Sequence, residues 1–172
     1  LGEVLSAGGV RTAGAHGHGY FNGAGFQQGF DKWDVVKQLK WNNTTDENVT
    51  SPELEAIVEK QLSDPKFTSG RFFAWVHFMD PHDKYLPHEG IPFGKGLREH
   101  YDGEVTFTDR WVKKLLDFAA VYGIRSGIHG PTDGLPLITI DRRVQRLVQE
   151  RLKQALEICA ELQASHDKPR CW

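Results

Sequence analysis

Three observations predict an α/β protein with a mostly parallel sheet flanked by helices. Segments of helical and strand character alternate along the chain, in the order helix, strand, helix, strand, helix, strand, helix. Residues 72–78, FFAWVHF, are almost uniformly apolar, which is typical of a central strand buried on both faces between layers of helices. Two longer segments, roughly 101–120 and 141–163, carry apolar residues at helical spacing and predict amphipathic helices.

The N-terminal part predicts a short helix, a strand and a loop. Residues 1–7 place aliphatic side chains on one face, and Gly8-Gly9 is a usual helix end because glycine adopts the left-handed conformation easily. The small residues at 10–15 predict a strand, and residues 16–25 a glycine-rich loop. Residues 27–41 carry aromatic side chains without a clean period, and we interpret them as irregular.

The middle of the chain predicts a helix, the apolar strand and a second helix. At the first helix start, Ser51 can cap, Pro52 suits the first turn and Glu53 favours the positive end of the dipole. This helix is expected to run to about Asp64. A loop rich in Pro and Gly, residues 81–96, then leads from the strand to the second helix. The expected buried stripe of that helix is Val105, Thr108, Val112, Leu115, Leu116 and Ala119.

After Tyr122 the character of the sequence changes. Residues 123–134 predict a loop, residues 135–140 a short strand, and residues 141–163 a strongly periodic helix. Its mixed acidic and basic residues are interpreted as a solvated face.

Composition excludes several classes of protein. The chain has 172 residues, which suits one domain or part of a larger one, with 39% hydrophobic and 26% charged residues. A formal net charge of -2 argues against a nucleic-acid or anionic-lipid partner, and the apolar runs are too short to cross a membrane. The chain has only two cysteines, Cys159 and Cys171, which are too few for a disulfide framework or a cysteine-rich zinc site. Because the chain begins with Leu rather than Met, we expect an internal fragment.

Four segments match family motifs in the correct order. Residues 70–85, GRFFAWVHFMDPHDKY, resemble an apolar strand that runs into H-x-x-[DE]-P-H-x-P-Y, with Lys84 in place of the last Pro, and residues 101–109, YDGEVTFTD, resemble Y-D-x-E-V-x-x-x-D. Residues 1–12 resemble L-x-x-x-L-x-x-x-G-Y-x-T, and residues 25–31 resemble G-F-x-x-G-F-D. On these segments the chain resembles the sulfatase family of the alkaline-phosphatase-like superfamily. The resemblance implies a partial sulfatase catalytic domain at residues 1–122 and a divergent C-terminal segment, with its long helix, at residues 123–172.

The resemblance implies hydrolysis of sulfate esters by a formylglycine nucleophile and calcium. The formylglycine forms from Cys or Ser in C/S-x-P-x-R, which lies outside this chain, as do the calcium ligands. Asp141 falls about where a late calcium ligand would come, but Arg142-Arg143 follows it instead of His-Gly. The chain alone is therefore expected to be inactive, and the expected partner of the parent protein is a small sulfate ester or a sulfated glycan.

His82 is the best candidate for a catalytic and substrate-binding residue. It lies just past the end of the apolar strand, and ligands of open α/β sheets bind outside the carboxyl ends of strands. An imidazole there can donate to sulfate oxygens or protonate the leaving oxygen. By resemblance, His82 matches the family's sulfate-contacting histidine. The alternative is a loop histidine that contacts only solvent.

His18 is a second substrate-binding candidate. The family continues with G-K-W-H-x-G at this point, but the Lys is missing here and the histidines do not fall cleanly into that frame. Neighbouring glycines would let the loop approach a pocket closely. A plain loop histidine is the alternative, and His16 with His18 makes a weak zinc argument without a third ligand. We interpret His77 as a hydrogen-bonded core residue, and Asp80 as a residue that shapes the turn by accepting backbone N–H groups.

Two other functions remain open. The first is a phosphodiester or phosphonate hydrolase, or a phosphoryl-headgroup transferase, of the same superfamily. The second is a non-catalytic interaction protein. Apolar residues between Val148 and Leu162 step by four and three, as in a short coiled coil, which predicts helix-mediated self-association.

Overall fold

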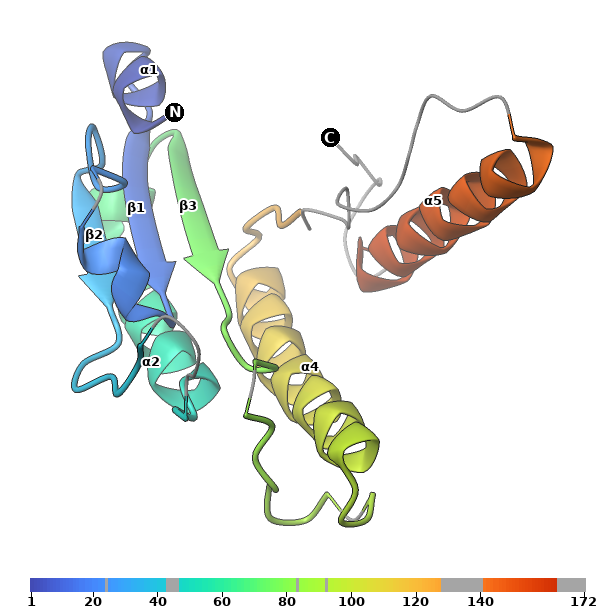
Figure 1. The fold of residues 1–172 in the computed structure, drawn as a ribbon. Coiled ribbons are helices and arrows are strands. Elements are labelled where there is room, and N and C mark those ends of the chain that lie inside the picture. The colour runs from blue at the N-terminus through green and yellow to red at the C-terminus, as the bar shows by residue number, and fades with distance from the viewer. Residues whose placement is uncertain (24, 43–46, 83, 92, 128–140, 164–172) are drawn as a thin grey trace. The chain divides into compact units, whose positions relative to one another are not determined.

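The described part of the chain contains both helices and strands, interspersed as the sequence predicts. The computed structural model describes residues 1–23, 25–42, 47–82, 84–91, 93–127 and 141–163 (Figure 1). The elements in chain order are α1 (Gly2–Ala7), β1 (Arg11–His16), the 3-10 helix η1 (Gly19–Asn22), β2 (Lys32–Val35), α2 (Ser51–Leu62), α3 (Pro65–Thr68), β3 (Phe72–His77), α4 (Leu97–Val121) and α5 (Arg142–Gln163). The chain divides into two units, Leu1–Leu115 and Leu116–Trp172, with the boundary inside α4.

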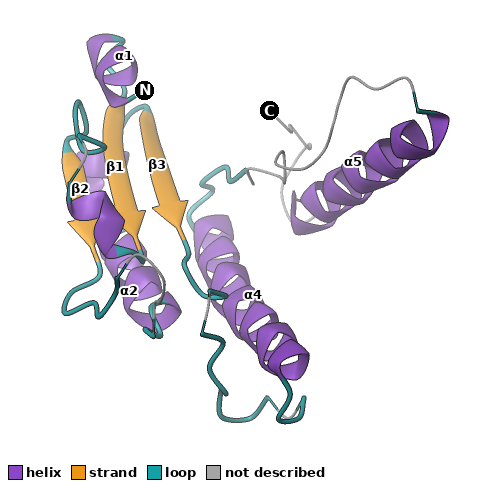
Figure 2. Cartoon of the chain, viewed as in Figure 1, coloured by secondary structure: helices purple, strands orange, loops and turns teal. Residues whose placement is uncertain are grey.

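The three strands of the first unit form a parallel sheet in the order β2-β1-β3 (Figure 2). Ala13 of β1 pairs with Lys32 of β2, and the last residues of β1 and β3, His16 and His77, pair with each other. The expected α/β class with flanking helices is therefore confirmed at this level. Because the pairing is parallel, the carboxyl ends of all three strands meet at one edge of the sheet.

β1, rather than β3, is the central strand. Its residues from Thr12 to His16 are buried, whereas β3 is only half-buried along its whole length. The prediction that FFAWVHF forms the buried central strand is therefore wrong for the residues that the structure describes. Large neighbours cover β1 and demand small residues in it: a Cβ on Gly14 would collide with the Trp33 indole and lie 2.7 Å from the Nε2 of His16.

The edge strand β2 lies in the segment that was interpreted as irregular, so that interpretation is wrong at residues 32–35. Three half-buried residues and one exposed residue at a sheet edge need no alternating pattern, which is why periodicity missed the strand. Its place is fixed by Asp31, whose Oδ2 accepts the backbone N–H of Thr12 at 2.7 Å. The expected glycine-rich loop begins one residue later than predicted, since His16 belongs to β1, and it contains η1.

The apolar core of the first unit lies between β1 and the helix α2. The buried apolar side chains of α2 and α3 are Leu54, Val58, Leu62 and Phe67, and α2 also buries the polar side chains of Glu55 and Gln61. The buried Gln61 ties α2 to the sheet, because its Nε2 donates to the backbone oxygen of Gly14 at 3.2 Å and to Asp34 Oδ2 at 2.7 Å. α2 is thus fixed against the central strand.

α4 begins four residues earlier than expected and presents the predicted stripe. Ala119 is buried and the other five residues of the stripe are half-buried. Gly103 and Glu104 in the first half of the helix are also buried, although the stripe did not include them. A buried carboxylate therefore lies within α4 of the first unit.

α5 confirms the predicted C-terminal helix. Val148 is buried, whereas Leu152, which was expected on the same face, is exposed. Asp141 precedes the helix, and its Oδ1 accepts the N–H of Arg143 at 2.7 Å. The predicted strand at residues 135–140 lies outside the described residues. No helix in the described part of the chain is both long and apolar enough to cross a membrane.

Candidate functional site

The two histidines predicted from the sequence come together at the carboxyl edge of the sheet. His18 follows β1 by two residues, and His82 follows β3 by five. Their ring centroids are 6.3 Å apart, with 38° between the ring planes. His82 is exposed and His18 is half-buried, so both belong to the surface of the first unit. The parallel strands thus bring two distant segments of the chain to one place.

The orientation of His18 is set by η1 and by Trp41. Its Nδ1 accepts the backbone N–H of Tyr20 at 3.1 Å, so the ring caps η1 and the neutral imidazole carries its proton on Nε2. The His18 ring lies 4.7 Å from that of Trp41. Gly19 permits this packing, since a Cβ at that position would collide with the Trp41 indole. His18 is therefore a held side chain rather than a freely rotating one.

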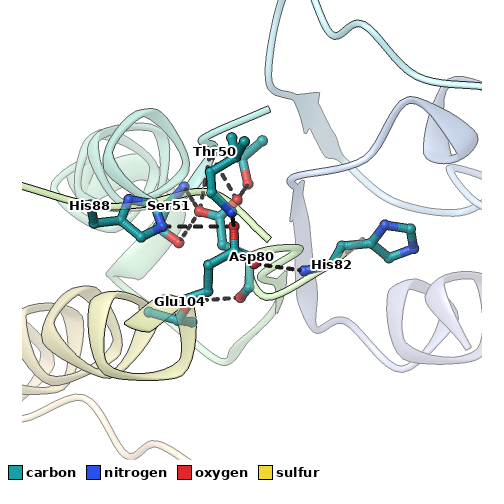
Figure 3. Close-up of polar contacts among 8 residues, drawn as sticks. Thr50, Ser51, Asp80, His82, His88 and Glu104 are labelled. Carbon is teal, nitrogen blue, oxygen red and sulfur yellow. Dashed lines mark hydrogen bonds and ion pairs between the residues drawn. The ribbon is translucent and has the colours of Figure 1, made fainter. Parts of the chain in front are cut away.

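Asp80 fixes the start of the turn that carries His82. Its buried carboxylate accepts the backbone N–H groups of Thr50 and Ser51, the closer at 2.8 Å, and their hydroxyls at 3.1 and 2.6 Å (Figure 3). The residue therefore accepts backbone N–H groups, as expected, but from α2 rather than from its own turn. Ser51 does not cap the helix as expected. The N-cap residue is Thr50, and its side chain makes no hydrogen bond to α2. Asp80 accepts the N–H groups at the start of the helix instead.

α4 holds the same turn from the other side. Glu104 Oε2 accepts the backbone N–H of His82 at 3.2 Å, and Oε1 accepts that of Leu86 at 2.8 Å. Thr108 adds a bond from its hydroxyl to the backbone oxygen of Asp80 at 2.6 Å. Figure 3 shows the imidazole of His82 pointing away from Asp80 and Glu104 while its backbone faces them. The turn is thus anchored through its backbone, and the ring is left outside the cluster.

His88 lies against Glu104 and the ring of Phe107. The rings of His88 and Phe107 stack at 3.8 Å, and Nε2 of His88 lies 3.7 Å from Glu104 Oε1. Burial lowers the pKa of His88 and raises the pKa of Glu104, so burial disfavours a charged pair. His88 lies in a loop but is not a surface residue, because only 5% of its side chain is exposed.

Two more histidines lie at the ends of the paired strands. His16 is fully buried, stacks on Phe21 at 4.3 Å and lies against Trp33 at 4.1 Å and Trp75 at 4.7 Å. Within the described part of the chain, neither of its ring nitrogens has a hydrogen-bond partner. Burial, with a smaller effect of His77, lowers the pKa of His16 to about 4. The ring is therefore neutral at pH 7.

His77 is less buried than the core residue that the sequence predicts. It is half-buried, and its Nδ1 is buried with no hydrogen-bond partner among the residues that the structure describes. Burial lowers the pKa of His77, and the neighbouring His18 adds to the effect. Both histidines at the strand ends therefore favour the neutral form.

The described residues offer no ligand set for a metal ion. No group of three or more His, Cys, Asp or Glu side chains lies close enough together in the described ranges to hold one. His16 is enclosed by aromatic rings, whereas His18 caps η1, so the two do not form a zinc site. The calcium that the sulfatase resemblance implies stays a prediction for the parent protein.

Sequence reasoning missed the carboxylate that anchors the site. Glu104 precedes Thr108 by one helical repeat of four, so it shares the face of a residue already assigned to the buried stripe. A charged residue on a buried face is the signal that could have identified it. Thr50 and Ser51 gave no such signal, because a helix start explains them without a distant partner.

Comparison with family models, with curated proteins and with solved structures finds no match for this chain.

Proposed function

We propose that the chain is part of a sulfuric ester hydrolase in which His82 and His18 contact the sulfate group. The observation that carries this proposal is the approach of the two rings to 6.3 Å at the carboxyl edge of a parallel sheet. Ligands of open α/β sheets bind at this edge. The four segments that resemble sulfatase motifs support the same assignment and favour it over other anionic ligands. The proposed fold is accordingly a partial sulfatase fold.

The two imidazoles suit a small tetrahedral anion. N–H···O bonds of about 2.9 Å from rings at this separation can reach two oxygens of one sulfate group. The proton on Nε2 of His18 makes that nitrogen a donor, since Nδ1 already accepts from Tyr20. His82, when protonated, can donate a second bond or give its proton to the leaving oxygen. These residues would bind and orient the ester, and His82 would assist departure of the alcohol.

The nucleophile is assigned outside the chain. The resemblance implies a formylglycine hydrate that attacks sulfur, with calcium stabilising charge on the sulfate oxygens. Residues 1–122 would supply one wall of the active site. The substrate class is a small sulfate ester or a sulfated glycan.

Binding to the chain itself tests the proposal. Protein with isotopically labelled histidines is titrated with sodium sulfate and with phenyl sulfate, and the histidine ring signals are followed by NMR. Sodium chloride at matched ionic strength is the control titration. We expect saturable shifts of the His82 and His18 signals, weakened in His82→Gln and His18→Gln. The same change at His100, a histidine of α4, serves as the control and should leave the midpoint unchanged. Chloride and sulfate producing equal shifts would refute the proposal.

Activity provides a second arm. The chain alone is expected to leave 4-nitrophenyl sulfate intact, because its nucleophile lies elsewhere. Turnover that disappears in His82→Ala would show that this assignment of the nucleophile is wrong. Turnover of bis(4-nitrophenyl) phosphate in place of the sulfate would favour the phosphodiesterase alternative.

A further inference from the structure

His82 stands on a segment whose backbone is held by a buried carboxylate from another element. Glu104 of α4 is 2% exposed, and each of its two oxygens accepts a different backbone N–H, one from His82 and one from Leu86. α4 also contacts the start of this segment through Thr108, which donates to the backbone oxygen of Asp80. α4 therefore makes three hydrogen bonds to the backbone of this segment, while the His82 ring points away from Asp80 and Glu104 (Figure 3).

We propose that Glu104 is the positioning residue of this site: by binding the backbone of His82 it presents the imidazole toward His18 for the anion. The inference deepens the proposed function and rests on it. Glu104 touches no substrate in this arrangement and acts through His82. Asp80 holds the beginning of the turn against α2, and Glu104 sets the positions of the backbone at His82 and Leu86.

The chemistry of the contact requires a carboxylate. An ionised carboxylate accepts at both oxygens, whereas a glutamine accepts at one oxygen and would direct its NH₂ group at the second N–H. Two N–H groups that meet two different oxygens therefore distinguish Glu104 from its neutral isostere. Hydrogen bonds to an ionised acceptor are also about twice as strong as those between neutral groups.

Stability alone would not favour this residue. Burial raises the pKa of Glu104, and the charge of Asp80 adds to the effect, while the bonds from Leu86 and His82 oppose it. An acid whose folded pKa is raised favours folding most below its ordinary value of 4.5, and that contribution is lost as the pH rises through the folded pKa. Of the other groups facing it, His88 favours its neutral form because of burial, and His82 opposes the rise in the pKa of Glu104 through both its backbone N–H and the charge of its ring. Near neutral pH the carboxylate thus holds the turn at the expense of folding free energy, as is common at functional sites.

The test uses the full chain and Glu104→Gln, with Asp109→Asn as the matched control on an exposed carboxylate of the same helix. Hydrogen exchange at the amides of His82 and Leu86 is measured first, without any anion. Sodium sulfate is then titrated, and the midpoint is read from the His82 ring. We expect faster exchange at both amides in Glu104→Gln and a sulfate midpoint raised about tenfold, the effect of one charge-assisted hydrogen bond. Asp109→Asn should match the wild type in both.

A merely structural role predicts a different result. It would lower the midpoint of urea unfolding near pH 7 in Glu104→Gln without changing sulfate binding to the protein that remains folded. The wild type supplies a check that needs no variant: the amide signals of His82 and Leu86 should titrate together with the Glu104 carboxyl, above 4.5. Unchanged exchange and an unchanged sulfate midpoint in Glu104→Gln would overturn the inference. Absence of sulfate binding in the wild type would instead overturn the proposed function, while the exchange rates still decide whether Glu104 holds His82.

Discussion

Replacing Asp80 by Ala removes the acceptor on which the start of α2 depends. The carboxylate accepts four donors in a buried setting: the N–H and hydroxyl groups of Thr50 at 3.1 Å, and those of Ser51 at 2.8 and 2.6 Å. The alanine methyl group offers no acceptor to any of them. Thr50 and Ser51 are themselves buried at 1% and 0% exposure, so solvent does not replace the lost bonds.

The expected loss of folding free energy is about 3 kcal/mol. Loss of a helix-capping acceptor contributes ~1 kcal/mol. Each of the two buried hydroxyls left without its acceptor contributes a further ~1 kcal/mol, the lower end of the usual range. Asp80→Asn keeps one carbonyl oxygen, and we expect it to lose about half as much. Since domains of this size have only 5 to 15 kcal/mol in total, as a rough range, the change should be easy to measure.

Urea unfolding at neutral pH measures the effect, followed by tryptophan fluorescence and by far-UV circular dichroism. A double-mutant cycle with Ser51→Ala isolates the hydroxyl contact: Ser51→Ala should destabilise the wild type but scarcely change Asp80→Ala. Asp109→Ala, at an exposed position of α4, provides the control. A loss below about 1 kcal/mol in Asp80→Ala, or full additivity with Ser51→Ala, would refute the role of the carboxylate as the cap of α2.

Two further predictions concern the packing around β1. The pKa of His16 is about 4 in the folded protein and 6.5 ordinarily, so the unfolded chain binds a proton at a higher pH than the folded protein does. The free energy of unfolding therefore falls as the pH drops from 6.5 to 4, by about 3 kcal/mol in all. His16→Phe should remove this part of the pH dependence of the urea midpoint; an unchanged dependence would contradict the assignment. Gly14→Ala should cost about 1–3 kcal/mol by overpacking against Trp33. Gly23→Ala, whose Cβ meets no atom within 4 Å, is its matched control, and equal unfolding midpoints of the two variants would count against the packing described for Gly14.

Periodicity predicts the long elements well because tertiary contacts leave a regular trace in the sequence. α2 and α4 each bury one face with residues at helical spacing, and α5 buries Val148. β2 leaves no such trace, since a four-residue edge strand is held by its pairing with β1 and by Asp31. The apolarity of residues 72–78 predicts a strand correctly but misplaces it in the sheet. Small residues can occupy the centre when aromatic neighbours cover them.

The candidate site is predictable only where a motif marks it. His82 and His18 can be selected from their positions after strands, and the structure brings them to 6.3 Å. The residues that hold them depend on contacts across tens of positions, such as that of Asp80 with Thr50, and local patterns do not encode these. Glu104 is the intermediate case, because its place on a buried helical face is visible, whereas its partners in the turn are not.

The parallel register of β1 and β3 has a consequence for the order of folding. Arg11 pairs with Phe72 and His16 with His77, so roughly 60 residues must be made before the two strands can meet. During synthesis the chain therefore exposes RTAGAH, a segment of small and polar residues with little tendency to aggregate. FFAWVH is the more aggregation-prone segment. It is synthesised after β1, β2 and α2, so β1 is already available to pair with it. The placing of the small-residue strand first and the aromatic strand last shortens the time for which the aggregation-prone segment is unpaired.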